Sequence, residues 1–170
     1  MYTLIDHLGY TVWATTKLSQ ILEKADDSLL RRPIQSSFPS IEKTILHIWD
    51  AEIAWLKRLH GISITEWPSK NFAGDKQALL AGWLQSGVEF KAYIDAQGPA
   101  YLQQQIDYRN TAGKPFANTV EEIIYHVVNH GTFHRGQIVT MLRAGGWAEK
   151  PENEILTSTD LVTYLRETRP

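Results

Sequence analysis

The sequence predicts an all-α protein that folds as a four-helix bundle, with a short C-terminal helix and a small β-hairpin before the fourth long helix. Two observations lead to this fold class. Four long segments repeat apolar residues at helical spacing, and packing them together as a bundle is the simplest way to bury four such stripes. The chain has 170 residues, enough for one core of this kind. We therefore expect a single domain over residues 1–170.

The first helix is expected from Tyr2 to about Lys24, and its apolar residues recur at helical steps: Leu4, Leu8, Val12, Leu18 and Leu22. Residues 26–40 contain two prolines and a polar cluster. This composition predicts a loop that ends at Ser40, which is a favourable N-cap.

The second helix is expected from Ile41 to about His60, with Gly61 as its C-terminal stop. It is apolar on two sides, with one face formed by Ile41, Ile45, Ile48, Trp55 and Leu59 and the other by Leu46, Trp49 and Ile53. A helix with two apolar faces lies either at the centre of a bundle or in an oligomer interface. The sequence leaves both alternatives open.

The later elements follow from turn and capping residues. A loop is expected over residues 62–74. A third helix is expected from Asp75 to about Gln97, and it stops at Gly98 and Pro99. Alternating residues between Tyr101 and Asn118 favour a two-stranded hairpin. A fourth helix then opens at a capping box formed by Thr119 and Glu122 and ends at Gly145. A short terminal helix is expected over residues 158–167, capped by Thr159 or Asp160.

Composition excludes several classes of partner. The net charge is −2 and no basic run is present, which argues against a nucleic-acid partner. No stretch reaches the roughly 18 apolar residues of a membrane span, and the first residues lack the pattern of a secretory signal. We therefore expect no membrane partner and take the cytoplasm as the default compartment. Because the chain has no cysteine, a transition-metal site would have to use mainly histidines.

The fourth helix carries a histidine at every fourth position, namely His126, His130 and His134. Residues at this spacing lie on one helix face, which we expect to point into the core and to include Ile123, His126, His130, Phe133, His134, Gln137 and Met141. The outer two histidines are about 12 Å apart along the axis, so only one adjacent pair can bind the same ion. Buried histidines need hydrogen-bond partners or a metal.

A third ligand has to come from another helix. His47 is the preferred candidate because Ala51 and Ala54 leave space beside it, whereas His7 lies near the N-terminus and His60 at a helix end. Asp50, one turn away from His47, could orient an imidazole or act as a base. Gln137, one turn beyond His134, is a second candidate for a hydrogen bond near the ion. The alternative is a set of histidines hydrogen-bonded in the core without metal.

Three further side chains are placed by the same reasoning. Arg135 is expected to point away from the histidine stripe and to pair with a neighbouring helix or subunit. Tyr10 and Trp13 could line a pocket, although core packing is the expected role for each.

The run HVVNHGTFHRGQI, from His126 to Ile138, closely resembles the signature of the DinB/YfiT-like metalloprotein family. LHIWDAEIAWLKRLHG resembles that family's ligand-bearing second helix, and DLVTYLRE is typical of its C-terminal part. The resemblance covers nearly the whole chain and implies a four-helix bundle of the DinB/YfiT type, commonly dimeric, with a divalent metal bound by three histidines. Carried over by position, the ligands become His47, His130 and His134. His126 matches a position that the family often fills with histidine without using it as a regular ligand.

Similar proteins include thiol S-transferases, a maleylpyruvate isomerase branch and hydrolases. The leading hypothesis is therefore a metal-dependent enzyme with thiol S-transferase-like or hydrolase-like chemistry. Its expected partners are a small-molecule substrate such as a low-molecular-weight thiol, and a second copy of the chain in a homodimer. Nickel or zinc is expected first as the divalent ion, with iron or manganese as alternatives. The alternative function is a non-catalytic, metal-stabilised dimer that binds a ligand or a partner protein.

Overall fold

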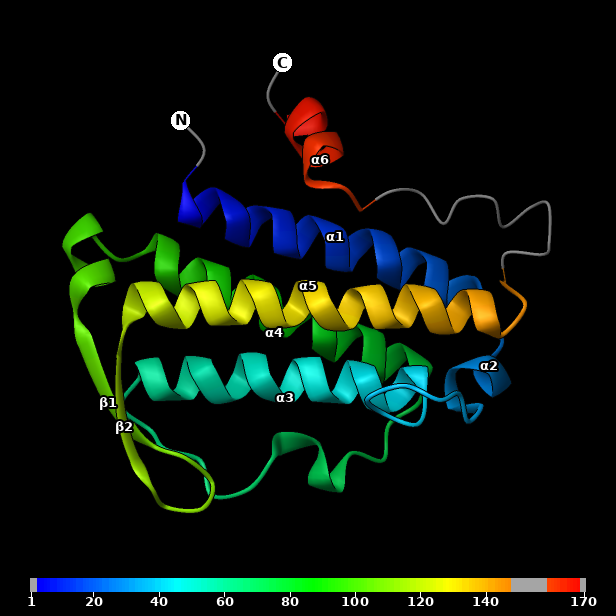
Figure 1. Ribbon diagram of the computed structural model, residues 1–170, viewed down its shortest axis with the longest axis horizontal. Helices are drawn as coiled ribbons and strands as arrows, with labels where there is room; N and C mark the ends of the chain where they lie inside the picture. Colours follow the sequence, from blue (N-terminus) through cyan, green and yellow to red (C-terminus); the bar gives the residue numbers. More distant parts are fainter. Residues whose placement is uncertain (1–2, 148–158, 169–170) are drawn as a thin grey trace.

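The computed structural model describes residues 3–147 and 159–168. Its frame consists of four long helices, α1 (Leu4–Lys24), α3 (Ile41–Leu59), α4 (Lys76–Asp95) and α5 (Val120–Ala144). Both α1 and α3 pack against α4 and α5, so α1 and α3 occupy opposite corners of the bundle (Figure 1). The four-helix bundle is confirmed, and the connection between α1 and α3 runs across one end of it.

Shorter elements join and cover these helices. They are α2 (Asp27–Arg31), the 3-10 turns η1 (Pro68–Asn71) and η2 (Pro99–Gln103), the strands β1 (Gln105–Arg109) and β2 (Pro115–Thr119), and α6 (Leu161–Thr168). The hairpin prediction is confirmed: β1 and β2 pair antiparallel, with Gln105 opposite Thr119. The terminal helix also forms and packs on α1. Position 158, where it was expected to begin, lies outside the described residues.

The prediction of an uninterrupted loop over residues 26–40 was wrong, because α2 lies within it. The physical reason is that Leu29 and Leu30 are both buried in the core. Two adjacent leucines in a polar segment carry no helical periodicity, so the sequence alone did not indicate this turn of helix.

Helix limits follow capping side chains. The Ser40 hydroxyl accepts from the backbone N–H of Lys43 at 3.2 Å and opens α3. Thr119 and Glu122 form the expected capping box at the start of α5. Thr3 forms another capping box with Asp6 at the start of α1, which begins at Leu4. Tyr2, where the first helix was expected to begin, lies outside the described residues. At the end of α3, Gly61 has a φ of 76°, a conformation that favours glycine.

The second apolar face of α3 is covered within the chain. Trp49 packs edge-on against Phe72, with ring centroids 5.6 Å apart. On α4, Gly82 allows the indole to approach so closely that an added Cβ would lie 2.5 Å from it. Contacts within the chain therefore cover Trp49 on this face, and the oligomer-interface alternative that the sequence left open stays a prediction.

The core is divided into two apolar clusters. One lies at the α2 end of the bundle and includes Leu22, Ile45, Trp83 and Met141, and the other lies at the hairpin end and includes Leu8, Phe90, Ile94, Ile123 and Val127. Each long helix carries polar residues between its two apolar parts. The middle layer of the bundle is therefore polar, and His134 and Arg135 of α5 lie in this layer.

Within the described part of the chain, none of the helices combines the length and the apolar character that crossing a bilayer requires.

Candidate metal centre

Helices α3 and α5 bring three imidazoles together. The Nε2 atoms of His47 and His130 are 2.9 Å apart, and the ring of His134 lies within 4.7 Å of both other rings, centroid to centroid. One nitrogen of each residue lies within 4.8 Å of the other two. The structure thus unites the three histidines that the sequence and its resemblance singled out.

A hydrogen bond to Gln137 orients the ring of His134 relative to His47 and His130. Its Nδ1 lies 2.7 Å from the Oε1 of Gln137, and the Nε2 of Gln137 donates to the Ser37 hydroxyl at 2.7 Å. A donor at Nδ1 leaves the Nε2 of His134 with a free lone pair. The expectation that Gln137 hydrogen-bonds beside the triad agrees with this geometry.

Phe38 packs over the triad from the loop that precedes α3. Its ring centroid lies 4.2 Å from that of His47 and 5.7 Å from that of His134. The same loop therefore contributes an apolar cover through Phe38 and a hydrogen bond through Ser37. Sequence reasoning identified neither residue, because both lie in a segment with no periodic signal.

Burial favours the neutral form of two of these imidazoles, those of His47 and His130. It lowers the pKa of His47 to about 4, with a smaller effect from the neighbouring His134. Burial also lowers the pKa of His130 to about 3, and His134, His47 and His126 add to the effect. Neutral imidazoles present the lone pairs that a metal ion requires, without first having to lose a proton near pH 7.

The donor set fits a divalent metal ion. Nitrogen ligands about 2.1 Å from one ion are roughly 3 to 3.5 Å from each other. His47 and His130 are close to that separation, and the group as a whole spans at most 4.8 Å. Among the described residues, these three are the single cluster of at least three potential metal ligands. Three imidazoles suit zinc, nickel, iron and manganese alike, so the donor set does not select among them.

Comparison with known proteins assigns the chain to a family. Residues 1–160 match the DinB family. The chain belongs to this family. It is 27% identical to Protein DinB of Bacillus subtilis (strain 168) over 167 residues, which cover 94% of this chain and 92% of that protein.

Two solved structures share the fold of this DinB-family chain. A DinB-like protein from Bacillus cereus ATCC 10987 superposes with a TM-score of 0.65 and 18% identity, covering 86% of this chain and 95% of that one. YfiT from Bacillus subtilis superposes with a TM-score of 0.66 and 16% identity, covering 86% and 90%. YfiT is described as a probable metal-dependent hydrolase with an unusual four-helix bundle topology.

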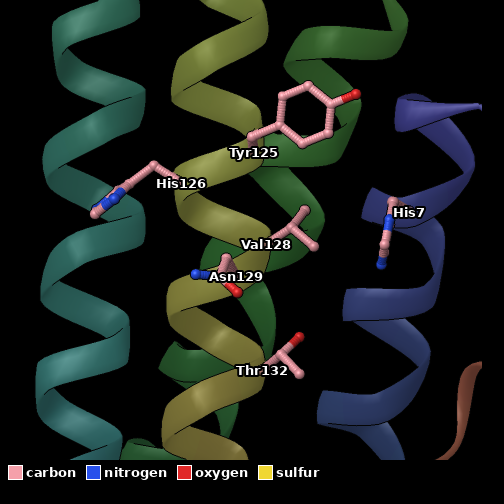
Figure 2. Close-up of a pocket in the computed structure, with 6 residues that line it drawn as sticks. All are labelled: His7, Tyr125, His126, Val128, Asn129 and Thr132. Atoms are coloured by element: carbon pink, nitrogen blue, oxygen red, sulfur yellow. The ribbon is translucent and has the colours of Figure 1, made fainter.

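His126 lies beside the triad and outside it. Its ring stacks on that of His130 with centroids 5.6 Å apart and meets Trp55 edge-on at 5.2 Å. Figure 2 shows its side chain directed toward α3, whereas His7 lies on α1 at the other side of α5. The two histidines therefore do not converge on a second site, although both line the shallow pocket along α5.

The expectation that the whole histidine stripe faces the core was wrong in part. Phe133 is 61% exposed, and His126 is exposed as well. The buried arc of α5 is centred on Val127, Gly131 and Ile138. The histidines consequently lie along the edge of this arc that faces α3, between core and solvent.

Asp50 lies on the wall of a cavity that also reaches His47. Its carboxylate accepts from the backbone N–H of Ser69 at 2.7 Å and from the Ser69 hydroxyl at 2.5 Å. Burial raises the pKa of Asp50, and the two bonds from Ser69 oppose that rise. These hydrogen bonds join α3 to η1. The expectation that Asp50 orients an imidazole is therefore not matched by the hydrogen bonds found for its carboxylate.

A buried polar layer, which sequence reasoning missed, lies beside the triad. Glu52 of α3 is 3% exposed and accepts a short hydrogen bond from the Ser86 hydroxyl of α4. Burial raises the pKa of Glu52 to about 7, against the opposing effects of Ser86 and the charge of Arg135. The position of Glu52 was available from the sequence, since it follows Ile48 by one turn on the apolar face of α3.

Arg135 belongs to the same layer. Its guanidinium is 2% exposed and donates to the Thr132 hydroxyl at 3.0 Å, with the Tyr10 ring 5.8 Å away. The expected ion pair with a neighbouring helix is absent from the salt bridges of the described residues. Arg135 is instead enclosed in the bundle, where burial lowers its pKa and interactions with Tyr10 and Glu52 oppose that effect. Tyr10 packs against Tyr164 and serves as core, as expected.

Proposed function

We propose that His47, His130 and His134 hold a divalent metal ion and that the protein is a metal-dependent enzyme acting on a small molecule. The observation that carries this proposal is the convergence of three imidazole nitrogens within 4.8 Å. When bound, such an ion supplies Lewis-acid chemistry, because it lowers the pKa of a water or thiol beside it toward neutrality. Hydrolase-like and thiol S-transferase-like reactions both need a nucleophile of this kind.

The chain's own residues would prepare the site in three ways. Gln137 holds the His134 ring so that Nε2 points toward the other imidazoles. Phe38 covers the His47 ring and excludes water from that side. Asp50 lines the adjoining cavity, where its carboxylate is a candidate to accept a proton from a substrate or a water. The description of YfiT as a probable metal-dependent hydrolase supports the hydrolytic alternative.

Metal analysis of untagged protein tests the first part of the proposal. We expect about one divalent ion per chain in the wild-type protein, loss of that ion in His130→Ala, and retention in His126→Ala. His126 is a matched control because its ring stacks on His130 while lying outside the triad. Equal metal content in His130→Ala and wild type would contradict the assignment.

The reaction itself requires a separate assay. The zinc- and nickel-loaded proteins should be screened with ester and amide substrates, and with low-molecular-weight thiols plus an electrophile. Turnover that disappears in His130→Ala and persists in His126→Ala would support an enzyme. A metal-loaded protein that turns over neither panel would favour the second candidate function.

The second candidate is a non-catalytic, metal-stabilised homodimer that binds a ligand or partner. It is favoured by the outer face of α5, where Tyr125 and Phe133 are 57% and 61% exposed. Large exposed aromatic side chains are typical of interfaces. Sedimentation of Phe133→Ser should show loss of a dimer if this face is the interface, whereas Ile62→Ser, which replaces a side chain 55% exposed elsewhere, should not.

A further inference from the structure

A cavity of about 320 Å³ adjoins the triad at His47. It lies between the first three turns of α3, the loop before that helix and the segment that holds η1. Its lining residues are Phe38, Pro39, Lys43, Leu46, His47, Asp50, Trp67 and Ser69. This volume is within the range of about 300–1,000 Å³ that is usual for small-molecule sites.

The cavity holds one basic and one acidic side chain, Lys43 and Asp50, at different places along α3. Lys43 lies one turn before His47 on α3 and forms no salt bridge with any described residue. Asp50 lies about 10 Å further along the helix axis, and both of its oxygens accept hydrogen bonds from Ser69. The N-terminal end of α3 adds partial positive charge beside Lys43. The lysine therefore remains available to an anion.

The remaining walls are apolar and aromatic. The Phe38 ring packs on that of His47 at 4.2 Å. Leu46 is buried, whereas the Trp67 side chain stays 44% exposed at the cavity. Aromatic walls beside a lysine are suited to a planar ligand that has an apolar body and a single negatively charged group.

We propose that this cavity binds a small organic anion, with its apolar body between Phe38 and Trp67 and its carboxylate or sulfonate on the Lys43 ammonium. The ligand then lies against His47, one side of the triad. Because this inference names a substrate class for the enzyme, it rests on the proposed function. Binding of the anion does not itself require a metal, so the two can be tested separately.

The test compares 2-naphthoate with its neutral analogue 2-naphthamide by titration calorimetry, using chelator-treated protein so that no carboxylate–metal bond contributes. Naphthoate should bind one per chain and about tenfold more tightly than the amide. Lys43→Gln should abolish this preference, while Lys57→Gln, which removes an exposed lysine from the same helix away from the cavity, should leave it intact. Trp67→Ala should weaken the binding of both compounds.

Equal affinity for the acid and the amide, or an unchanged preference in Lys43→Gln, would overturn the proposal. Circular dichroism of each variant verifies that it folds, and Lys43→Arg, which keeps the charge, should retain the preference. Zinc binding is measured on the same samples. Lys43-dependent binding in a protein that takes up no metal would refute the proposed function alone, and metal uptake without any Lys43 effect would refute the anion site alone.

Discussion

The Nδ1 of His134 lies 2.7 Å from the Oε1 of Gln137, and this contact decides which nitrogen of His134 faces His47 and His130. Gln137→Leu removes the acceptor while keeping a side chain of similar size. We expect its zinc affinity to fall by about 10- to 100-fold, as for other partners that orient a metal-binding imidazole. Competition with a chromophoric chelator measures this change.

Gln137→Glu is the matched control for that prediction. A glutamate keeps the acceptor for His134 and loses only the donor to Ser37. It should bind zinc at least as tightly as the wild-type protein. If the leucine variant also kept wild-type affinity, the His134 ring would be held by its packing and not by this hydrogen bond.

Glu52 should make the free energy of unfolding fall as the pH rises between about 4.5 and 7. Its pKa is raised by burial from 4.5 to about 7 in the folded protein, so in this window the folded state holds a proton that the unfolded state has lost. This stabilisation is complete below pH 4.5 and is lost above about pH 7. Its size over the whole window is on the order of 3 kcal/mol.

The measurement is urea unfolding at pH 5 and pH 8 for wild type and Glu52→Gln. Relative to the variant, the wild type should lose about 2 kcal/mol between the two pH values. Glu23→Gln on the surface of α1 controls for removal of one negative charge. A constant difference between wild type and Glu52→Gln at both pH values would mean that burial does not hold this proton.

Gly82 should tolerate no side chain, because an added Cβ would lie 2.5 Å from the Trp49 indole. We expect Gly82→Ala to destabilise the protein by about 1–3 kcal/mol through overpacking between α3 and α4. Gly136→Ala is its counterpart on α5, where nothing lies within 4 Å of the added carbon. That variant should gain about 0.5–1 kcal/mol from helix propensity. Thermal unfolding compares the two, and a neutral Gly82→Ala would show that Trp49 can move aside.

The sequence was sufficient for features that depend on local patterns. Ser40 and Thr119 marked the starts of α3 and α5, since capping preferences act within four residues. The i, i+4 spacing likewise identified His130 and His134 as a pair. His47 is 83 residues away from His130, so its place in the site followed from the family resemblance and from the space beside it.

Features that depend on packing between helices were missed. Phe133 shares a stripe with the histidines, yet it is exposed because the neighbours of α5 cover an arc centred elsewhere. Arg135 was expected to form an ion pair with a neighbouring helix or subunit, and Glu52 was not singled out although it follows Ile48 by one turn; both are buried. A charged residue on an apolar helix face can lie at the solvated edge of that face or within a buried polar layer, and only the tertiary contacts distinguish these two positions.

Ser69 should hold the segment between α3 and α4 against the bundle through its two hydrogen bonds to Asp50. Ser69→Ala removes the hydroxyl donor and keeps the backbone one, so we expect faster limited proteolysis within residues 62–75 at little change in global stability. Ser36→Ala, in the exposed loop before α3, should be cleaved at the wild-type rate. Because Trp67 belongs to the same segment as Ser69, Ser69→Ala should also weaken 2-naphthoate binding. Faster cleavage with unchanged naphthoate affinity would mean that Trp67 stays in place without this anchor.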